Sequence, residues 1–298
     1  TLVILGANPV YEAPSDLDFA AAMESVALRV HLGHYEDETA FLCHWHVPES
    51  HYLEAWSDLR SYDGTVSIVQ PLIQPLYPTR SAHEVVAVLT GQSGKPVLDL
   101  LRERWEQLPP FSGGDFERDW KTALHDGVIA GSAFATRHVE MRRGLQMPAD
   151  FGRRVDPDEG LELCLRPDAY LGGGANANNG WLQETPRPIT RLTWDNAALV
   201  SPATAQRLGV HNEQVLNLTV DGRSVAAPAW ILPGQADGVI TLNLGGGRQR
   251  AGRVGDGVGC DAGRLRSMDA LWSTTAVTVA KTFDQHRFIP FVYGEISD

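Results

Sequence analysis

The strongest constraint on the fold is the alternation of short apolar runs with helix-like segments over about the first fifty residues. Apolar runs that stop at glycine, asparagine or proline are typical of buried parallel strands that end in loops. Such runs are "TLVILGANP", "LRVHLG" and "HWHV". Between them, residues 15–30 and 37–43 have helical character, with Ser15 or Asp16 as the candidate N-cap of the first helix. This order predicts a parallel, doubly wound α/β sheet whose ligands bind at the carboxyl ends of the strands.

The middle of the chain has a helical character. Amphipathic spacing predicts helices in "SAHEVVAVLTG" and "PVLDLLRERWEQL", and a further helix in "DFERDWKTALHDGVI" that begins at Asp115. Residues 109–157 also hold several glycines, prolines and charges. We therefore expect a helical linker or insertion over 109–157, between a partial α/β domain at 1–108 and a second domain at 158–298.

The remainder of the sequence predicts β-structure. Short strands are expected in "LELCLRP", "QVLNLTVDG", "RSVAAPAWILP" and "GVITLNLG". The Asp221-Gly222 pair between two of them indicates a tight hairpin. One short helix is expected in "SPATAQRLGV", with Ser201 as N-cap, Pro202 at the first helical position and Gly209 just past the end. Short strands with regular turns are typical of a barrel or sandwich.

Composition excludes several classes of protein. The formal net charge of -12, without a cluster of lysines and arginines, argues against nucleic-acid binding. The three cysteines lie about a hundred residues apart, so they form no CxxC pair for zinc or an iron–sulfur cluster. No apolar run reaches the roughly 18–20 residues that cross a bilayer, so we expect a soluble chain without direct membrane insertion. The start at Thr1, inside an apolar run, suggests a piece of a longer protein.

The stretch "CHWHVPESHYLEAWSD" at residues 43–58 is rich in metal-binding groups. His44 and His46, two positions apart on a strand, would project from one face, with His51 or Glu49 as a third ligand beyond the turn. Alternatively, an imidazole on a buried strand donates to a backbone carbonyl and orders the loop that follows. We favour the structural alternative, because a metal site needs supporting partners that the sequence does not identify. No metal ligand is assigned.

Three glycine- and asparagine-containing loops are candidates for binding a cofactor. The first ends the N-terminal strand, where a nucleotide phosphate or ribose would sit. In the second, "YLGGGANANNGWLQE", amides freed by glycine and asparagine donors suit a pyrophosphate or pterin. In the third, "LGGGRQRAGRVGDGVGCDAGRLR", Arg248, Arg250 and Arg253 suit phosphate. The alternative for each loop is a plain turn or flexible connection. The candidate cofactor-binding residues are Gly6, Asn8, Pro9, Asn176, Asn178, Trp181, Gln183, Gly245, Arg248, Arg253, Gly259 and Asp261.

No catalytic residue is assigned. The sequence contains no Gly-x-Ser-x-Gly elbow, which argues against a serine hydrolase. Cys260, in a glycine-rich loop with arginines, is either a thiol of lowered pKa or a small packed residue, and we favour packing.

Several of these motifs, in their order, resemble a known family. The run from "VSPATAQRLGV" to "VGCDAGRLR" is similar to the C-terminal domain of the molybdopterin oxidoreductases, the dimethylsulfoxide reductase superfamily. "ILGANPVYEAP" resembles the strand and loop by which the family's preceding α/β domain approaches a molybdopterin guanine dinucleotide. The resemblance implies an α/β nucleotide-binding-like domain followed by a six-stranded, molybdopterin dinucleotide-binding-like β-barrel.

The histidine-rich stretch, with "DGTVSIVQPLIQPLY" after it, is most similar to one branch of this family. That branch comprises the molybdopterin-oxidoreductase-like subunit of bacterial alternative complex III and of polysulfide-reductase-like complexes. The resemblance implies partners: other domains of the same polypeptide, and iron–sulfur and membrane subunits of a respiratory complex, placed at the periplasmic face of a bacterial membrane. Iron–sulfur clusters are implied only outside this chain, and so is the family's molybdenum ligand.

The sequence departs from the family at Asp261, where relatives carry asparagine. A carboxylate beside a pyrophosphate repels it unless a basic residue intervenes. We therefore expect molybdopterin guanine dinucleotide, the family's cofactor, to be absent from this chain. The first hypothesis is a C-terminal fragment that serves as a non-catalytic scaffold in a respiratory electron-transfer complex. The alternative is the cofactor-binding half of an active oxidoreductase of the molybdopterin type.

Overall fold

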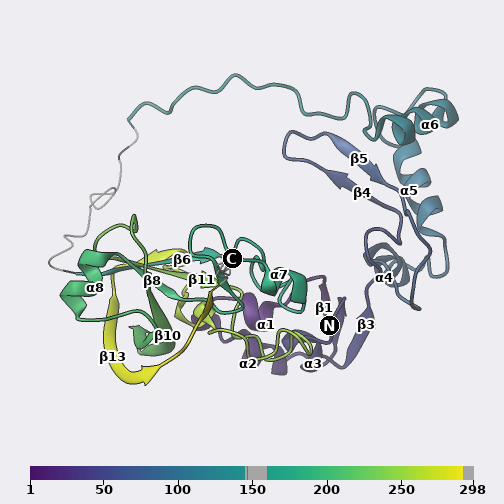
Figure 1. The fold of residues 1–298 in the computed structure, drawn as a ribbon. Coiled ribbons are helices and arrows are strands. Elements are labelled where there is room, and N and C mark those ends of the chain that lie inside the picture. Colours follow the sequence, from purple (N-terminus) through teal and green to yellow (C-terminus); the bar gives the residue numbers. More distant parts are fainter. Residues whose placement is uncertain (145, 147–159, 291–298) are drawn as a thin grey trace, which may run out of the picture.

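The computed structural model describes residues 1–144, 146 and 160–290. These residues form an N-terminal α/β unit, a helical unit with a β-hairpin, and a C-terminal β unit (Figure 1). Part of the expected connection at 109–157, namely residues 145 and 147–157, lies outside the described residues, as do 158, 159 and 291–298 of the expected second domain. The division at residues 108 and 157 stays a prediction.

The N-terminal unit is built on a small parallel sheet. Strand β1 (Leu2–Leu5) pairs with β2 (Arg29–Gly33), which pairs with β3 (Trp45–Pro48). All three expected strands are present. The order β1-β2-β3 follows the sequence, however, so the described residues contain no reversal of strand order, and the doubly wound arrangement is not formed within them. Instead, each connection adds the next strand to the same edge of the sheet, so that β2 lies between β1 and β3.

The helices of this unit are shorter than the sequence pattern predicts. The expected helix over 15–30 is a 3-10 turn η1 (Ser15–Leu17) followed by α2 (Phe19–Glu24). Asp18 lies between them with a left-handed φ of 42°, which interrupts the helical backbone and makes Asp18, not Ser15 or Asp16, the residue before α2. Helix α1 (Pro9–Glu12) follows β1, and α3 (Glu38–Phe41) precedes β3.

The helical unit contains the three helices that the sequence predicts. Helix α4 (Ala82–Leu89) begins with a capping box at Ser81, α5 is Val97–Glu106, and α6 (Phe116–Asp126) begins with Asp115, whose side chain accepts the Arg118 N–H. Helices α5 and α6 pack against a hairpin of β4 (Ser57–Arg60) and β5 (Val66–Val69). Trp105, Phe111 and Trp120 form the centre of the shared core.

The C-terminal unit is built on a curled sheet, beside a small two-stranded sheet (Figure 1). The strands of the curled sheet, in spatial order, are β12 (Ser273–Thr274), β6 (Glu162–Pro167), β11 (Val239–Leu244), β8 (Ala198–Val200), β10 (Arg223–Ile231), β9 (Gln214–Val220) and β13 (Val277–Gln285). The curled sheet thus has seven strands where a six-stranded barrel is expected, and within the described ranges no ladder joins its edge strands β12 and β13. Strand β13 forms one edge of the sheet, beside β9.

The predicted hairpin turn and the predicted short helix of this unit are confirmed. Asp221 and Gly222, with φ of 48° and 77°, turn β9 into β10 as a tight hairpin. Helix α8 (Pro202–Leu208) begins at Ser201, whose hydroxyl accepts the Thr204 N–H, and ends at Gly209 with φ 63°. The remaining elements are α7 (Gly180–Glu184), β7 (Leu192–Thr193), η2 (Ala262–Leu265) and β14 (Ile289–Pro290).

The core of the C-terminal unit lies between the curled sheet, α8 and η2. Leu163, Leu216, Leu218, Ile240 and Leu265 are completely buried there. The N-terminal unit packs on this unit through η1 and η2, where the Ser15 amide donates to the Arg266 carbonyl. In the part of the chain that the structure describes, no helix has the length and apolarity to cross a membrane.

Candidate functional site

The carboxyl ends of β1 and β2 face the glycine-rich loop of the C-terminal unit across a small cavity. The cavity has a volume of about 100 Å³. Its walls include Gly6, Asn8, His31, Ala175 and Arg248. The structure therefore brings together the three loops that the sequence analysis singles out, although they are far apart along the chain.

Glu38, the first residue of α3, lies at the centre of this meeting point. Its carboxylate accepts hydrogen bonds from the Arg248 side chain, with Nε at 3.0 Å from both oxygens and Nη2 at 2.7 Å from Oε2. The backbone amides of Gln249 and Arg250 donate to Oε1 at 2.9 and 3.0 Å. Asn8 Nδ2 donates to Oε2 at 2.7 Å. Two predicted cofactor-binding residues, Asn8 and Arg248, are thus bound to an acidic residue that sequence reasoning missed.

These contacts determine the charge of Glu38. Burial by itself raises the pKa of a carboxyl group, but the hydrogen bonds from Arg248, Asn8 and the Arg250 amide outweigh it and lower the pKa of Glu38 to about 2. Arg248 is only 5% exposed. The pair is therefore an ionised, largely buried ion pair with nearly all of its hydrogen-bonding capacity used.

The other residues of the first loop also have internal roles. Asn8 Oδ1 accepts from the Thr39 amide at 3.2 Å and from its hydroxyl at 2.6 Å. Pro9 is the first residue of α1. Gly6 has a left-handed φ of 63°, which allows the turn at the end of β1.

The second loop is closed by its own side chains. Asn176 donates to the Tyr170 carbonyl at 3.1 Å, and Gln183 donates to the Ala177 carbonyl at 2.9 Å. Asn178 accepts from the Val254 amide at 3.1 Å. Trp181 is 84% exposed. These contacts stabilise the loop and attach it to the third loop.

The third loop is held by Asn196, a further residue that sequence reasoning missed. Its side chain donates to the carbonyls of Asn243 and Cys260 at 2.7 and 2.9 Å and accepts the Cys260 amide at 2.7 Å. A Cβ at Gly259 would lie 2.5 Å from Asn196 Oδ1, and the left-handed φ of 71° at this position also favours glycine. A Cβ at Gly245 would lie 2.9 Å from the Gly172 carbonyl oxygen. Close packing of the loops, rather than space for a ligand, thus explains these two glycines.

Asp261 faces the interior of the same loop. Its Oδ1 accepts the Gly263 amide at 3.0 Å and begins η2. Burial, assisted by the negative charge of Glu38, raises the pKa of Asp261 to about 6. Arg253 is exposed, and Arg250 stacks on Phe41 with 3.5 Å from its guanidinium carbon to the ring centroid.

Cys260 is a packed residue and not an activated thiol. Burial raises the pKa of its thiol to about 12, and the nearby carboxylate of Asp261 acts in the same direction. A thiolate is therefore strongly disfavoured at this position.

The histidine-rich stretch makes local structural contacts. His46 on β3 stacks on the buried His31 of β2, with 5.2 Å between ring centroids, and His31 Nε2 lies 3.2 Å from the Ala7 carbonyl. His44 Nδ1 accepts the Arg29 amide and His51 Nδ1 accepts the Leu53 amide. Among residues 1–144, 146 and 160–290, no three His, Cys, Asp or Glu side chains are placed to hold a metal ion.

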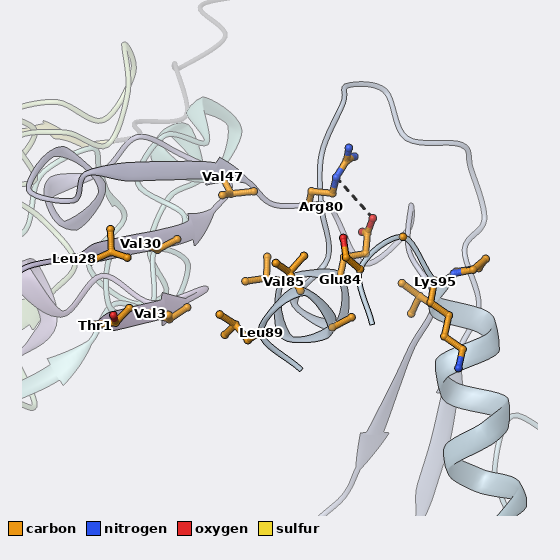
Figure 2. A pocket seen from close by; sticks show the side chains of 16 residues that line it. Thr1, Val3, Leu28, Val30, Val47, Arg80, Glu84, Val85, Leu89 and Lys95 are labelled. Carbon is orange, nitrogen blue, oxygen red and sulfur yellow. Dashed lines mark ion pairs between the residues drawn. The ribbon is translucent and has the colours of Figure 1, made fainter. Parts of the chain in front are cut away.

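A larger cavity of about 710 Å³ lies away from these loops. Figure 2 shows side chains of the sheet, including Val3 and Val30, on one side of it and Val85 and Leu89 of α4 on the other. None of the predicted cofactor-binding residues lines it. Its walls are mostly apolar, and the two cationic side chains that line it are paired with carboxylates, Arg80 with Glu84 and Lys95 with Glu103.

The arrangement does not fit a bound pyrophosphate. The guanidinium and the two amides that suit a phosphate are already bound to the Glu38 carboxylate. The cavity beside them, about 100 Å³, is smaller than the roughly 300–1,000 Å³ of usual ligand pockets. A dinucleotide at this position would have to displace Glu38 and separate the loops.

Comparisons with known proteins place the chain in a structural class. No family model matches it. Its fold is similar to that of acetylene hydratase from Pelobacter acetylenicus, with a TM-score of 0.67 and 14% identity over 94% of this chain and 44% of that one.

The sequence itself is also similar to that of a curated protein. The chain is 24% identical over 294 residues to the menaquinone reductase, molybdopterin-binding-like subunit of Nitratidesulfovibrio vulgaris, covering 94% of this chain and 41% of that protein. The resemblance to the molybdopterin oxidoreductases is thereby confirmed. The chain spans less than half the length of either relative.

Proposed function

We propose that the chain is part of a non-catalytic, molybdopterin-oxidoreductase-like subunit that serves as a scaffold in a respiratory electron-transfer complex. The observation that carries this proposal is the Glu38 carboxylate, which occupies the donors expected to hold the cofactor phosphate. A site whose donors are bound internally holds its loops together without a ligand.

The partners in this proposal are the remaining domains of the same polypeptide and iron–sulfur and membrane subunits. Support comes from the relative, which is a subunit of a menaquinone reductase. We further propose that the assembly is of the alternative complex III or polysulfide-reductase-like type, at the periplasmic face of a bacterial membrane. The C-terminal unit would correspond to the family's six-stranded barrel, in an open form with seven strands.

The second candidate is the cofactor-binding half of an active oxidoreductase. It is favoured by one observation: the three predicted loops meet at the carboxyl ends of β1 and β2. In that case molybdopterin guanine dinucleotide, when bound, would supply two-electron redox chemistry, and Asn8 and Arg248 would hold it after Glu38 had moved away.

Metal and pterin analysis of the natively purified protein separates the two candidates. Molybdenum and tungsten are measured by elemental analysis, and pterin by its fluorescent oxidation product. The scaffold proposal predicts that both are absent from a preparation that still contains iron. Stoichiometric metal together with pterin would refute it and support the enzyme.

A further inference from the structure

We propose that Glu38 is a built-in anion that fills a phosphate-type subsite formed by Arg248 and the amides of Gln249 and Arg250, and that its removal converts this position into an anion-binding site. The inference deepens the proposed cofactor-free role and rests on it, since it assigns the residue that replaces the ligand.

The contacts of Glu38 are those of a bound anion. Donors from the loop after β1 and from the loop at 248–250 converge on its two oxygens, at 2.7–3.0 Å. Arg248 meets the carboxylate side-on, with Nε donating to Oε1 and Nη2 to Oε2, which is the paired geometry that guanidinium groups also offer to phosphate. Consecutive backbone amides that point at one oxygen form the kind of concavity that binds anions.

The donors are held in place by groups other than Glu38. Arg248 Nη1 donates to the Gly174 carbonyl at 2.7 Å and Nη2 donates to the Arg250 carbonyl at 3.2 Å. The guanidinium also lies over the Tyr11 ring, 5.0 Å from its centroid, and the Tyr11 hydroxyl donates to the Gly246 carbonyl at 2.6 Å. Loss of the Glu38 carboxylate therefore leaves a fixed set of donors without their acceptor.

The next residues of the loop are held by contacts that do not involve Glu38. Asp256 Oδ1 accepts the amides of Ala251 and Gly252 at 2.7 and 3.0 Å. The backbone at 251–252 is thus held by a residue other than Glu38. Removal of Glu38 is expected to uncover the subsite and not to unfold the loop.

Two further carboxylates line the same cavity and oppose an incoming anion. Asp37 Oδ1 accepts a hydrogen bond from the Ala40 amide at 2.8 Å, and Asp37 Oδ2 lies 3.8 Å from His31 Nε2. Glu12 also lines the cavity, and its carboxylate has a backbone hydrogen bond at Asn8. Its neutralisation in addition to the loss of Glu38 is therefore expected to strengthen anion binding further.

The test is a calorimetric titration of inorganic pyrophosphate into this chain at low salt and pH 7. The wild type is expected to show no binding at millimolar pyrophosphate. Glu38→Ala is expected to bind at least about tenfold more tightly than the wild type, because it frees a buried guanidinium and two amides. Adding Arg248→Met to Glu38→Ala is expected to abolish the gain. The matched control, Glu24→Ala, removes an exposed carboxylate on α2 and is expected to behave like the wild type.

Glu38→Ser also removes the carboxylate and shortens the side chain, and it serves if Glu38→Ala does not fold, as judged by circular dichroism. It is also expected to gain affinity, and Glu12→Gln added to it is expected to raise the affinity further. Pyrophosphate binding by the wild type, or a folded Glu38 variant with no gain, would overturn the inference. These outcomes are independent of the pterin analysis, which tests the proposed role, so failure of one is distinguishable from failure of the other.

Discussion

Asp261→Asn is expected to stabilise the protein at neutral pH and to remove part of its pH dependence. The wild-type carboxyl is buried in the third loop, near the negative charge of Glu38. Its Oδ1 accepts the Gly263 amide at 3.0 Å. Asparagine has nearly the same shape and keeps an acceptor oxygen for that amide, so the substitution removes the charge and preserves the start of η2.

The magnitude follows from the pKa of Asp261, which is raised from its ordinary value of 3.8 to about 6. A difference of about two pKa units, at about 1.4 kcal/mol each, gives about 3 kcal/mol. Because the folded-state pKa is the higher one, the contribution of the Asp261 carboxyl group to the stability of the wild type is fully present below pH 3.8. This contribution is lost as the pH rises through 6. Asp261→Asn should therefore match the wild type near pH 3.8 and exceed its free energy of unfolding by about 3 kcal/mol at pH 7.

The assay is urea denaturation followed by tryptophan fluorescence over a pH series that brackets the two values. Asp269→Asn, which removes an exposed carboxylate eight positions further along the chain, is the matched control and should show no such pH-dependent difference. A difference between Asp261→Asn and wild type that stays constant with pH, or that is larger at low pH, would refute the reasoning.

Three further substitutions test the packing of the site by the same urea assay. Arg248→Met leaves the Glu38 carboxylate largely buried without its cation and should lower the free energy of unfolding by about 3 kcal/mol. Glu38→Gln in the same chain should restore most of this loss. Equal losses in the single and double variants would contradict the ion pair. Asn196→Ala removes three hydrogen bonds to backbone groups, two of them at Cys260, and should cost about 3 kcal/mol; a loss under about 1 kcal/mol would show that the loop is held otherwise. Gly222→Ala places a side chain at φ 77° and should cost about 1 kcal/mol, and an unchanged midpoint would argue against the tight hairpin.

The elements that sequence reasoning predicts well are those specified by neighbouring residues. The cap at Ser201, the start of α6 at Asp115 and the hairpin at Asp221-Gly222 depend on side chains or backbone conformations within three residues of one another. The arrangement of the C-terminal sheet depends on pairings across much longer separations. Strand β13 illustrates this, because most of its residues are exposed or half-buried and its sequence lacks the apolar run by which the neighbouring strands are recognised.

In the candidate site, too, some residues can be predicted from the sequence and others cannot. Glycines and arginines identify the loops that meet, since close backbone approach and anion recognition require these residue types. Glu38 carries no such signal: an acidic residue in the first turn of a helix is ordinary, and its partner Arg248 lies 210 positions further along the chain. Asn196 is similar, because an asparagine between strands is expected in turns whether or not it bonds to a distant loop.

In the proposed scaffold role, the internal carboxylate would allow a cofactor-like fold to keep its shape without a cofactor. In a site assembled from separate loops, the ligand itself holds the loops together, and its loss leaves buried donors without acceptors. Glu38 supplies the missing acceptor from within the chain and joins the N-terminal unit to the C-terminal unit through Arg248. The contacts of Tyr11 with Gly246 and of Ser15 with Arg266 join the same two units. The residues that would bind a cofactor then serve as the interface between two units, which is the property that a scaffold requires.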